Sequence, residues 1–252
     1  MIEIYNEDCV AALFKRKQKD IDIIVTSPPY NIGIDYGTYK DKLSHDDYIT
    51  WLGRVANSWN ENLKKDGHIF LNVSSLPKKP LLAWQILQPF LKYFQLQNNI
   101  LWIKNLTVDG VSRGHFKPIT SKRFLNHTNE FIFHMTRSGN VPIDRLAVGV
   151  PFSDKSNIKR FKSNKSDLRC NGNTWFIKYD TTNQPKDHPA SFPVELPTKC
   201  IKMAGFTSDT NVLDPFMGSG ASLVAAQELE INFLGYELDI NHFTKAKNKI
   251  LI

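Results

Sequence analysis

The sequence contains few cysteines and no long apolar run. Its three cysteines, Cys9, Cys170 and Cys200, lie far apart and form no Cys-x-x-Cys pair, so we expect neither a metal site nor a disulfide framework. Residues 1–10 are acidic and lack the pattern of a secretory signal. No apolar run approaches the roughly 20 residues that span a membrane. These absences argue against a fold that is stabilised by a metal, against a secreted protein and against a membrane protein. They predict a soluble, intracellular chain.

Length and charge indicate one domain with a polyanionic partner. A chain of 252 residues, 41% of them hydrophobic, can bury one large core. The net charge of +7 is uneven, because residues 151–186 carry eight basic side chains against three acidic ones and residues 104–123 carry five against one. Two basic inserts favour a nucleic acid, although solvated loops would have the same composition.

Short apolar runs rich in Ile, Val and Phe alternate with helical patterns. The expected strands are Ile2–Tyr5, Ile21–Val25, His68–Val73, Ile100–Ile103, Glu130–Met135, Val212–Phe216 and Phe233–Tyr236. The expected helices are Ser44–Lys65, capped by Ser44 and ended by Gly67, part of Pro80–Phe94, which Pro89 must bend or break, and Ala221–Glu230. This alternation predicts an α/β fold with a mostly parallel sheet and helices on both faces.

A glycine turn follows the strand expected at Val212–Phe216. There the chain reads Asp-Pro-Phe-Met-Gly-Ser-Gly from Asp214 to Gly220 and then enters a helix, which is how a nucleotide-type pocket is built at the end of a parallel strand. Gly218 and Gly220 let a ligand approach the backbone, and the helix start offers N–H groups. The turn lacks the Gly-Lys-Ser/Thr of a phosphate loop and a third glycine. Asp214 would repel a pyrophosphate but suits an ammonium group.

An acidic residue also ends the next expected strand. Glu237 follows Phe233–Tyr236, about 20 residues after the glycine turn, where nucleotide-binding folds place the acceptor for a ribose diol. Asp239 fits better as the cap of a following helix. Together Asp214 and Glu237 describe a site for an adenosine that has no phosphates and carries a positive tail, which S-adenosyl-L-methionine fits.

The buried strand Ile21–Val25 delivers the segment Thr26-Ser27-Pro28-Pro29-Tyr30. The proline carbonyls are held rigidly, and with the hydroxyl of Ser27 they can accept hydrogen bonds from an NH₂ group. Tyr30 offers a flat face on which a base can stack. On its own, this segment fits an ordinary strand-ending turn better than an active site.

The segment Thr26–Tyr30 followed by the turn Asp214–Gly220 resembles the β-type DNA amino-methyltransferases, in which the catalytic motif precedes the cofactor motif. The stretches Ile4–Cys9, Asn129–Phe133 and His188–Leu196 are similar to further family segments. The resemblance implies a Rossmann-like methyltransferase fold, S-adenosyl-L-methionine as cofactor, and catalysis by Ser27, Pro28, Pro29 and Tyr30. The cofactor-binding residues that it implies are Asp8, Cys9, His188, Pro189, Phe192, Asp214, Phe216, Gly218, Ser219, Gly220 and Glu237. The family often has two threonines where this chain has Ala221 and Ser222, so the contact to the cofactor carboxylate stays unassigned.

The resemblance also divides the chain. Residues 1–136 correspond to the catalytic half of the methyltransferase domain, 137–187 to a small irregular target-recognition region, and 188–252 to the cofactor-binding half. The basic inserts then become candidates for contacts to double-stranded DNA. These candidates are Arg113, Lys117, Lys122, Arg123, Lys159, Arg160, Lys162, Lys165 and Arg169.

The expected activity is methyl transfer to an exocyclic amine of a flipped-out base in duplex DNA. In the family, serine before Pro-Pro is typical of cytosine-N4 enzymes and aspartate of adenine-N6 enzymes, so Ser27 favours cytosine N4, with adenine N6 as the alternative. Methylation of RNA and a non-catalytic DNA-binding role are further alternatives. The family also implies a cytoplasmic, bacterial-type protein acting on nucleoid DNA, a restriction endonuclease as a partner, and in some members a homodimer.

Overall fold

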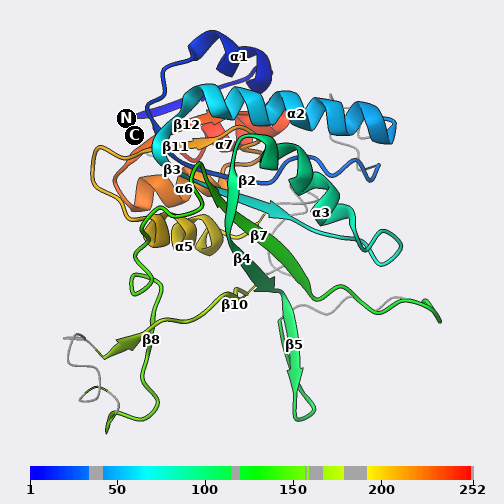
Figure 1. Cartoon of the computed structure of the whole chain (residues 1–252), viewed down its shortest axis with the longest axis vertical. Helices are drawn as coiled ribbons and strands as arrows, with labels where there is room; N and C mark the ends of the chain where they lie inside the picture. Colours follow the sequence, from blue (N-terminus) through cyan, green and yellow to red (C-terminus); the bar gives the residue numbers. More distant parts are fainter. Residues whose placement is uncertain (34–41, 115–119, 157, 159–166, 179–191, 251–252) are drawn as a thin grey trace.

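The computed structural model describes residues 1–33, 42–114, 120–156, 158, 167–178 and 192–250 (Figure 1). Its main sheet has eight strands in the order β1-β12-β11-β2-β3-β7-β4-β10. The strands are β1 (Ile2–Tyr5), β2 (Ile21–Thr26), β3 (Leu63–Val73), β4 (Gln95–Ile103), β7 (Asn129–Thr136), β10 (Thr174–Phe176), β11 (Asn211–Asp214) and β12 (Asn232–Tyr236). The helices are α1 (Cys9–Arg16), α2 (His45–Asn62), α3 (Leu82–Leu87), the 3-10 helix η1 (Gln88–Lys92), α5 (Glu195–Ala204), α6 (Ala221–Glu228) and α7 (Ile240–Lys247).

The sheet is mostly parallel, as the alternating pattern predicts. Strand β7 runs antiparallel to both of its neighbours, β3 and β4, and the other pairs in the sheet are parallel. The carboxyl ends of β12, β11, β2, β3, β4 and β10 therefore lie at one edge. In an open α/β sheet that edge is where ligands bind.

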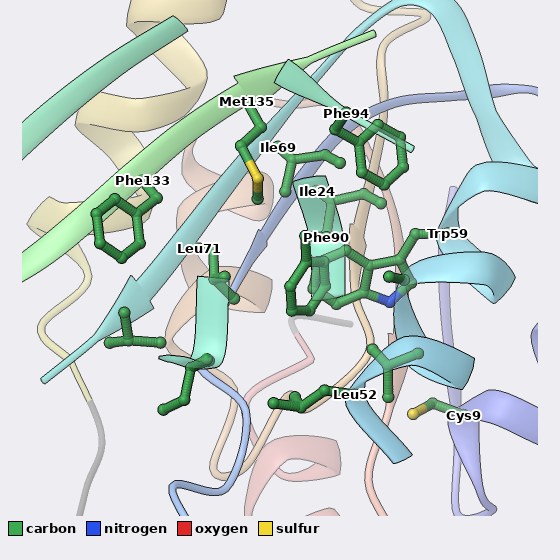
Figure 2. Packing of buried hydrophobic residues seen from close by; sticks show 14 of the residues in the cluster. Cys9, Ile24, Leu52, Trp59, Ile69, Leu71, Phe90, Phe94, Phe133 and Met135 are labelled. Atoms are coloured by element: carbon green, nitrogen blue, oxygen red, sulfur yellow. The ribbon is translucent and has the colours of Figure 1, made fainter. Parts of the chain in front are cut away.

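Helices cover both faces of the sheet. Figure 1 shows α1, α2 and α3 on one face and α5 and α6 on the other. Adjacent residues of β2 point to opposite sides, so Ile24 joins the core under α2 while Ile23 and Val25 join the core under α5 and α6. Figure 2 shows the first core, where Trp59 of α2 packs on Phe90 with ring centroids 4.8 Å apart. Burial on both faces explains why Ile23, Ile24 and Val25 form an unbroken apolar run in the middle of β2.

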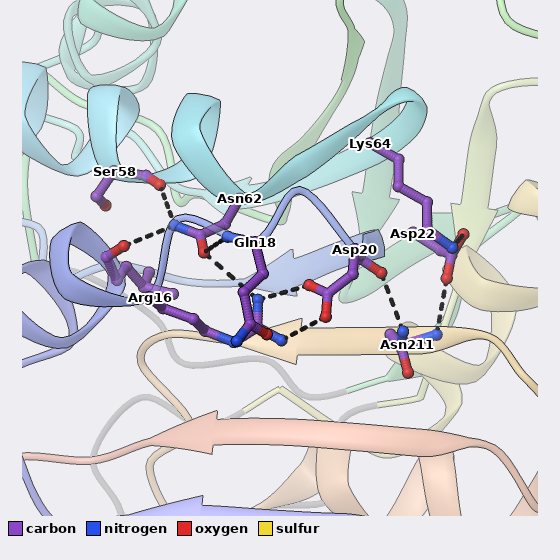
Figure 3. Close-up of polar contacts among 9 residues, drawn as sticks. Arg16, Gln18, Asp20, Asp22, Ser58, Asn62, Lys64 and Asn211 are labelled. Carbon is purple, nitrogen blue, oxygen red and sulfur yellow. Dashed lines mark hydrogen bonds and ion pairs between the residues drawn. The ribbon is translucent and has the colours of Figure 1, made fainter.

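Helix α2 begins as expected but ends earlier. Ser44 caps it by accepting from the backbone N–H of Asp47, yet the helix stops at Asn62, and the predicted end at Gly67 is wrong. Buried Asn62 donates to the carbonyls of Leu13 and Ser58, which fixes the last turn against α1 (Figure 3). Gly67 lies inside β3 instead, where a Cβ atom would come within 2.7 Å of a neighbouring side chain.

Polar side chains connect β2 and β11 near the amino-terminal ends of these strands, at the edge of the sheet opposite their carboxyl ends (Figure 3). Asp22 of β2 accepts from Lys64 Nζ at 2.7 Å and from the backbone N–H of Asn211, the first residue of β11, at 2.9 Å. Arg16 forms a two-pronged ion pair with Asp20 at 2.5 and 2.8 Å. These contacts hold β2 and β11 in register, so the chain segments that follow both strands emerge side by side.

The inserts contain more regular structure than their composition suggests. Residues 104–128 read as a loop, but β5 (Asn105–Val108) and β6 (Val111–Gly114) form a hairpin. Within 137–187, β10 pairs with β4 and completes the sheet, and β8 (Val150–Pro151) pairs with β9 (Leu168–Arg169). None of the helices in the described ranges is long and apolar enough to cross a bilayer.

Candidate active site

Three neighbouring strands bring the sequence motifs together. Strands β12, β11 and β2 are adjacent and parallel, and their carboxyl ends deliver Glu237, the turn Asp214–Gly220 and the segment Thr26–Tyr30. The first and last of these segments are about 210 residues apart in sequence. Their meeting follows from the strand order, which short-range patterns do not contain.

Asp214 is the structural link between the two main motifs. Its Oδ1 accepts from Thr26 Oγ1 at 2.6 Å and from the Phe216 backbone N–H at 3.1 Å, and its Oδ2 accepts from Ser222 Oγ. The side chain is 1% exposed, and this burial raises its pKa to about 6. Asp214 therefore braces β2, the glycine turn and α6. A direct contact to a cofactor ammonium group stays a prediction.

The glycine turn has the backbone that its sequence predicts. Gly218 and Gly220 have φ values of +54° and +87°, which favour glycine. A Cβ atom at Gly220 would also lie 3.1 Å from the Cβ of Ala246 in α7, so this glycine allows the close approach of that helix. No side chain caps the start of α6, so its first N–H groups face the turn. Lys249 donates to the Ser219 carbonyl from outside the turn.

Glu237 closes the turn from the neighbouring strand. Its two carboxylate oxygens accept from the backbone N–H groups of Gly218 at 2.8 Å and Asp239 at 2.9 Å, and burial raises its pKa. Asp239 caps α7, as expected. Asn6 donates to the Glu237 carbonyl and so brings the end of β1 beside this acid.

These donors and acceptors fit S-adenosyl-L-methionine. The strand ends supply two carboxylates and an uncapped helix start, and residues 214–220 contain no basic side chain that would suit phosphates. Each oxygen of Glu237 uses one protein donor, so lone pairs remain for a ribose diol. Asp214 would supply the negative charge for the positive tail.

Ser27 and Tyr30 contact each other within Thr26–Tyr30, the segment that is predicted to be catalytic and that we call the catalytic segment. Ser27 Oγ lies 2.9 Å from Tyr30 Oη, and the Tyr30 hydroxyl donates to the carbonyl of Asn72 at the end of β3, at 3.3 Å. Tyr48 of α2 donates to the Pro29 carbonyl at 2.6 Å. The Pro29 carbonyl is therefore engaged within the protein, and the role of Ser27 and the Pro28 carbonyl as acceptors for an amine stays a prediction.

Two aromatic residues of α2 belong to the site although the sequence identified neither as functional. Tyr48 stacks on Trp51 with ring centroids 5.9 Å apart, and Trp51 packs on Phe216 of the glycine turn at 5.7 Å. This row connects the catalytic segment to the turn. The helical spacing predicted Tyr48 only as a core position. The spacing does not show which side of the helix contacts the glycine turn.

A polar chain behind Tyr30 was also missed. Asn72 Nδ2 donates to Glu130 Oε2 at 2.8 Å, and Glu130 forms an ion pair with Lys104. The three residues lie at the catalytic edge on β3, β7 and immediately after β4. A polar residue at the end of an apolar strand was the available signal, but the partners depend on the strand order.

The remaining predicted residues are more dispersed. Asp8 caps α1 by accepting from the Ala11 backbone N–H, Cys9 is buried in the first core, and Phe192 packs against the second core. The exposed candidates for DNA contact are Arg113 on β6, Lys122, Arg123 and Arg169 on β9. Outside the described residues lie Lys117, Lys159, Arg160, Lys162, Lys165, His188 and Pro189. The described residues contain no cluster of three His, Cys, Asp or Glu that could hold a metal.

Comparison with known families agrees with this site. The model of the N6/N4 DNA methylase family matches residues 21–248, which include both motifs and nearly the whole sheet. The chain belongs to the N6/N4 DNA methylase family. The predicted resemblance is thereby confirmed. The chain is a DNA methyltransferase, and the cofactor of this family is S-adenosyl-L-methionine.

Individual members of the family match over most of their length. The type II methyltransferase M.ScaI of Streptomyces caespitosus is 27% identical, over 98% of this chain and 80% of the relative. The structure of the PvuII DNA methyltransferase, which is cytosine-N4-specific, superposes with a TM-score of 0.73 at 19% identity and covers 100% of this chain and 86% of that one. This likeness confirms the methyltransferase fold.

Proposed function

We propose that this DNA methyltransferase acts on the exocyclic N4 amine of a cytosine that is flipped out of duplex DNA. The observation that carries the proposal is Ser27 as the first residue of Ser-Pro-Pro-Tyr. Its hydroxyl oxygen lies 2.9 Å from that of Tyr30, and its neighbour Thr26 donates a hydrogen bond to Asp214. A base inside the duplex cannot reach Ser27, so the protein must rotate it out at a cost of a few kcal/mol.

The chain's own residues would position the base and prepare its amine. The ring of Tyr30 would stack on the base, and Ser27 Oγ with the Pro28 carbonyl would accept from its NH₂ group. These bonds draw the nitrogen lone pair out of conjugation and strengthen as the nitrogen loses planarity. Bound S-adenosyl-L-methionine would supply an electrophilic methyl group. The bond from its sulfonium sulfur to that methyl group would break as the bond to the amine nitrogen forms, leaving a neutral thioether, and the methylated nitrogen would then lose one proton to water. No cysteine nucleophile is required.

The binding roles follow from the same geometry. We propose Asp214, Glu237 and the turn from Phe216 to Gly220 as the cofactor site, together with Asp8 and Cys9 at the start of α1. His188, Pro189 and Phe192 would line its methionine end. Residues 137–187 would read the DNA sequence, except that β10 in this range also completes the sheet. A cognate restriction endonuclease is a proposed partner, since type II relatives match the chain.

Adenine N6 is the second candidate target. The DNA adenine methyltransferase YhdJ of Escherichia coli is 24% identical over 98% of this chain, and the family includes both kinds of enzyme. Ser27 favours cytosine, whereas either target amine could be held by a serine hydroxyl.

Transfer of a labelled methyl group tests the activity. Purified protein is incubated with tritium-labelled S-adenosyl-L-methionine and either unmethylated plasmid DNA or structured RNA. We expect label in the DNA and none in the RNA. Label in the RNA alone would contradict the proposal, and so would a protein that binds DNA but transfers no methyl group.

A further inference from the structure

The hairpin β5–β6 projects from the catalytic edge of the sheet. It follows β4 after Lys104, and the carboxyl end of β4 lies at the same edge as Ser27. Figure 1 shows β5 extending from the end of β4 away from the rest of the sheet. The hairpin therefore reaches outward from the side on which the substrate must bind.

The turn of the hairpin has a defined geometry. Asp109 and Gly110 have φ values of +50° and +77°, as in the two-residue type I′ turn, whose twist matches the flanking strands. The register pairs Val108 with Val111 and Leu106 with Arg113. The hairpin is therefore a regular β-ribbon.

The register gives the ribbon two different faces. Residues directly opposite each other in an antiparallel pair share a face, and faces alternate along a strand. Leu106, Val108, Val111 and Arg113 therefore form one face, which we call the apolar face. Thr107 and Ser112 lie on the other face, where their hydroxyl oxygens are 2.7 Å apart.

The apolar face is exposed in the isolated chain. Leu106, Val108 and Val111 are 44%, 54% and 60% exposed, and Arg113 is exposed as well. A two-stranded hairpin without a packing layer is marginally stable, and clustered exposed apolar side chains mark interaction sites. A partner that covers this face would therefore stabilise the hairpin.

The charge and position of the hairpin indicate that duplex DNA is this partner. An antiparallel β-ribbon fits the major groove, where apolar side chains can contact thymine methyl groups. The face carries a guanidinium, and residues 104–123 hold five basic side chains against one acidic one. Lys104 at the root of the hairpin pairs with Glu130, which holds Asn72 behind Tyr30. The ribbon is thus joined to the residues that receive the flipped base.

We infer that the apolar face of hairpin β5–β6 docks on the duplex beside the target base, with Arg113 on a phosphate or a base edge. The inference rests on DNA as the substrate of the family and is independent of which base amine is methylated. It assigns to three aliphatic residues a role in DNA binding that basic composition alone does not reveal.

A pair of variants that differ only in the face they alter tests this inference. Val108→Thr with Val111→Thr keeps the side-chain shape and the β propensity but makes the apolar face polar, whereas Thr107→Ala with Ser112→Ala alters the opposite face. The readouts are the KM for plasmid DNA in methyl transfer, the cofactor Kd and the sedimentation coefficient. The plasmid is one that the wild-type protein methylates, whether at cytosine or at adenine. The result therefore does not depend on which of the two base amines is the target.

The valine variant is expected to raise the KM for DNA about tenfold without changing the cofactor Kd, and the opposite-face variant to behave as wild type. The valine variant removes no charge, so the salt dependence of its DNA affinity should equal that of the wild type. Arg113→Ala removes one positive charge and should lower the slope of log affinity against log salt concentration by about one. A wild-type KM in the valine variant would overturn the inference. So would a change from dimer to monomer with DNA affinity retained, since a second copy would then cover the face.

Discussion

The hydroxyl oxygens of Ser27 and Tyr30 lie 2.9 Å apart, and the Tyr30 hydroxyl also lies 3.3 Å from the carbonyl oxygen of Asn72. Either hydroxyl can be the donor in the contact between Ser27 and Tyr30. In both arrangements Ser27 Oγ keeps at least one lone pair for an incoming group. An amine donor suits this geometry, which is the basis of the role that we propose for this serine.

Tyr30 is expected to contribute to base binding through its ring and to turnover through its hydroxyl. Tyr30→Phe keeps the ring for stacking but removes the hydroxyl that contacts Ser27 Oγ, so turnover should fall about tenfold with little change in the KM for DNA. Tyr30→Ala removes the stacking surface, which is worth about 1–3 kcal/mol per base, and should raise the KM as well. Steady-state kinetics with plasmid DNA separate the two effects. Equal losses in both variants would show that the ring has no separate role.

Ser27→Ala should reduce turnover by about 10²-fold and leave the cofactor Kd nearly unchanged. The reason is that the hydroxyl acts on the amine, and removing one such acceptor costs about 2–3 kcal/mol of transition-state stabilisation. Single-turnover methylation and calorimetric titration with S-adenosyl-L-methionine measure the two quantities. Full turnover in Ser27→Ala would show that the role given to this hydroxyl is wrong.

Cofactor affinity should fall as the pH drops through about 6. Burial raises the pKa of Asp214 to about 6, so below that pH the carboxylate is protonated and no longer attracts a positively charged ligand. Thr26→Val removes a hydrogen bond that lowers this pKa, and such bonds to charged groups are worth about 1.5–3 kcal/mol. The pH of half-maximal affinity should therefore move upward by about one unit or more.

The measurement is the cofactor Kd between pH 5 and 8 for the wild type, Thr26→Val and Thr26→Ser. The serine variant keeps the hydroxyl and should follow the wild type. An affinity that is independent of pH in the wild type would contradict the electrostatic role of Asp214.

Stability should also depend on pH through two buried histidines. His68 Nδ1 lies 3.0 Å from His134 Nε2, and burial lowers the pKa of both rings, that of His134 to about 3. In the unfolded chain a histidine takes up a proton below about pH 6.5. The folded form of His134 does not, so the stability that it contributes is present above pH 6.5 and is lost as the pH falls toward 3.

Urea unfolding at pH 8 and pH 6 measures this loss. The wild type should lose about 1 kcal/mol more than His134→Gln, whose amide does not titrate. Asp214 acts in the opposite direction, because its raised pKa makes the folded protein bind a proton near pH 6, but it is common to both proteins. An equal pH dependence in the two proteins would rule out the proposed effect of His134.

The sequence predicted the strands that are buried on both faces, because burial leaves mostly apolar residues in them. The predicted strands Ile21–Val25 and Val212–Phe216 correspond to β2 and to β11, which ends at Asp214, and the polar motifs that follow the two strands lie side by side. Helix α1 was missed because eight residues carry too few turns for a clear period. The hairpin at Asp109-Gly110 was missed because its strands bury no face, although this dipeptide is a hairpin signal.

The contacts behind the catalytic segment could not be predicted, since they join strands that are distant in sequence. Asn72 meets Glu130 because β3 pairs with β7, and Glu130 meets Lys104 because β7 pairs with β4. Tyr48 reaches the Pro29 carbonyl because α2 packs over the end of β2. In each case the residue type is visible in the sequence, and its partner depends on the topology.

The most direct test of the account is the identity of the methylated nucleoside. Plasmid DNA from a strain without methyltransferases is treated with the protein and S-adenosyl-L-methionine and then digested to nucleosides for mass spectrometry, with Ser27→Ala as the matched control. We predict N4-methyldeoxycytidine, absent or strongly reduced with the control. N6-methyldeoxyadenosine as the product would contradict the cytosine assignment, and the absence of any methylated nucleoside would contradict the proposed activity itself.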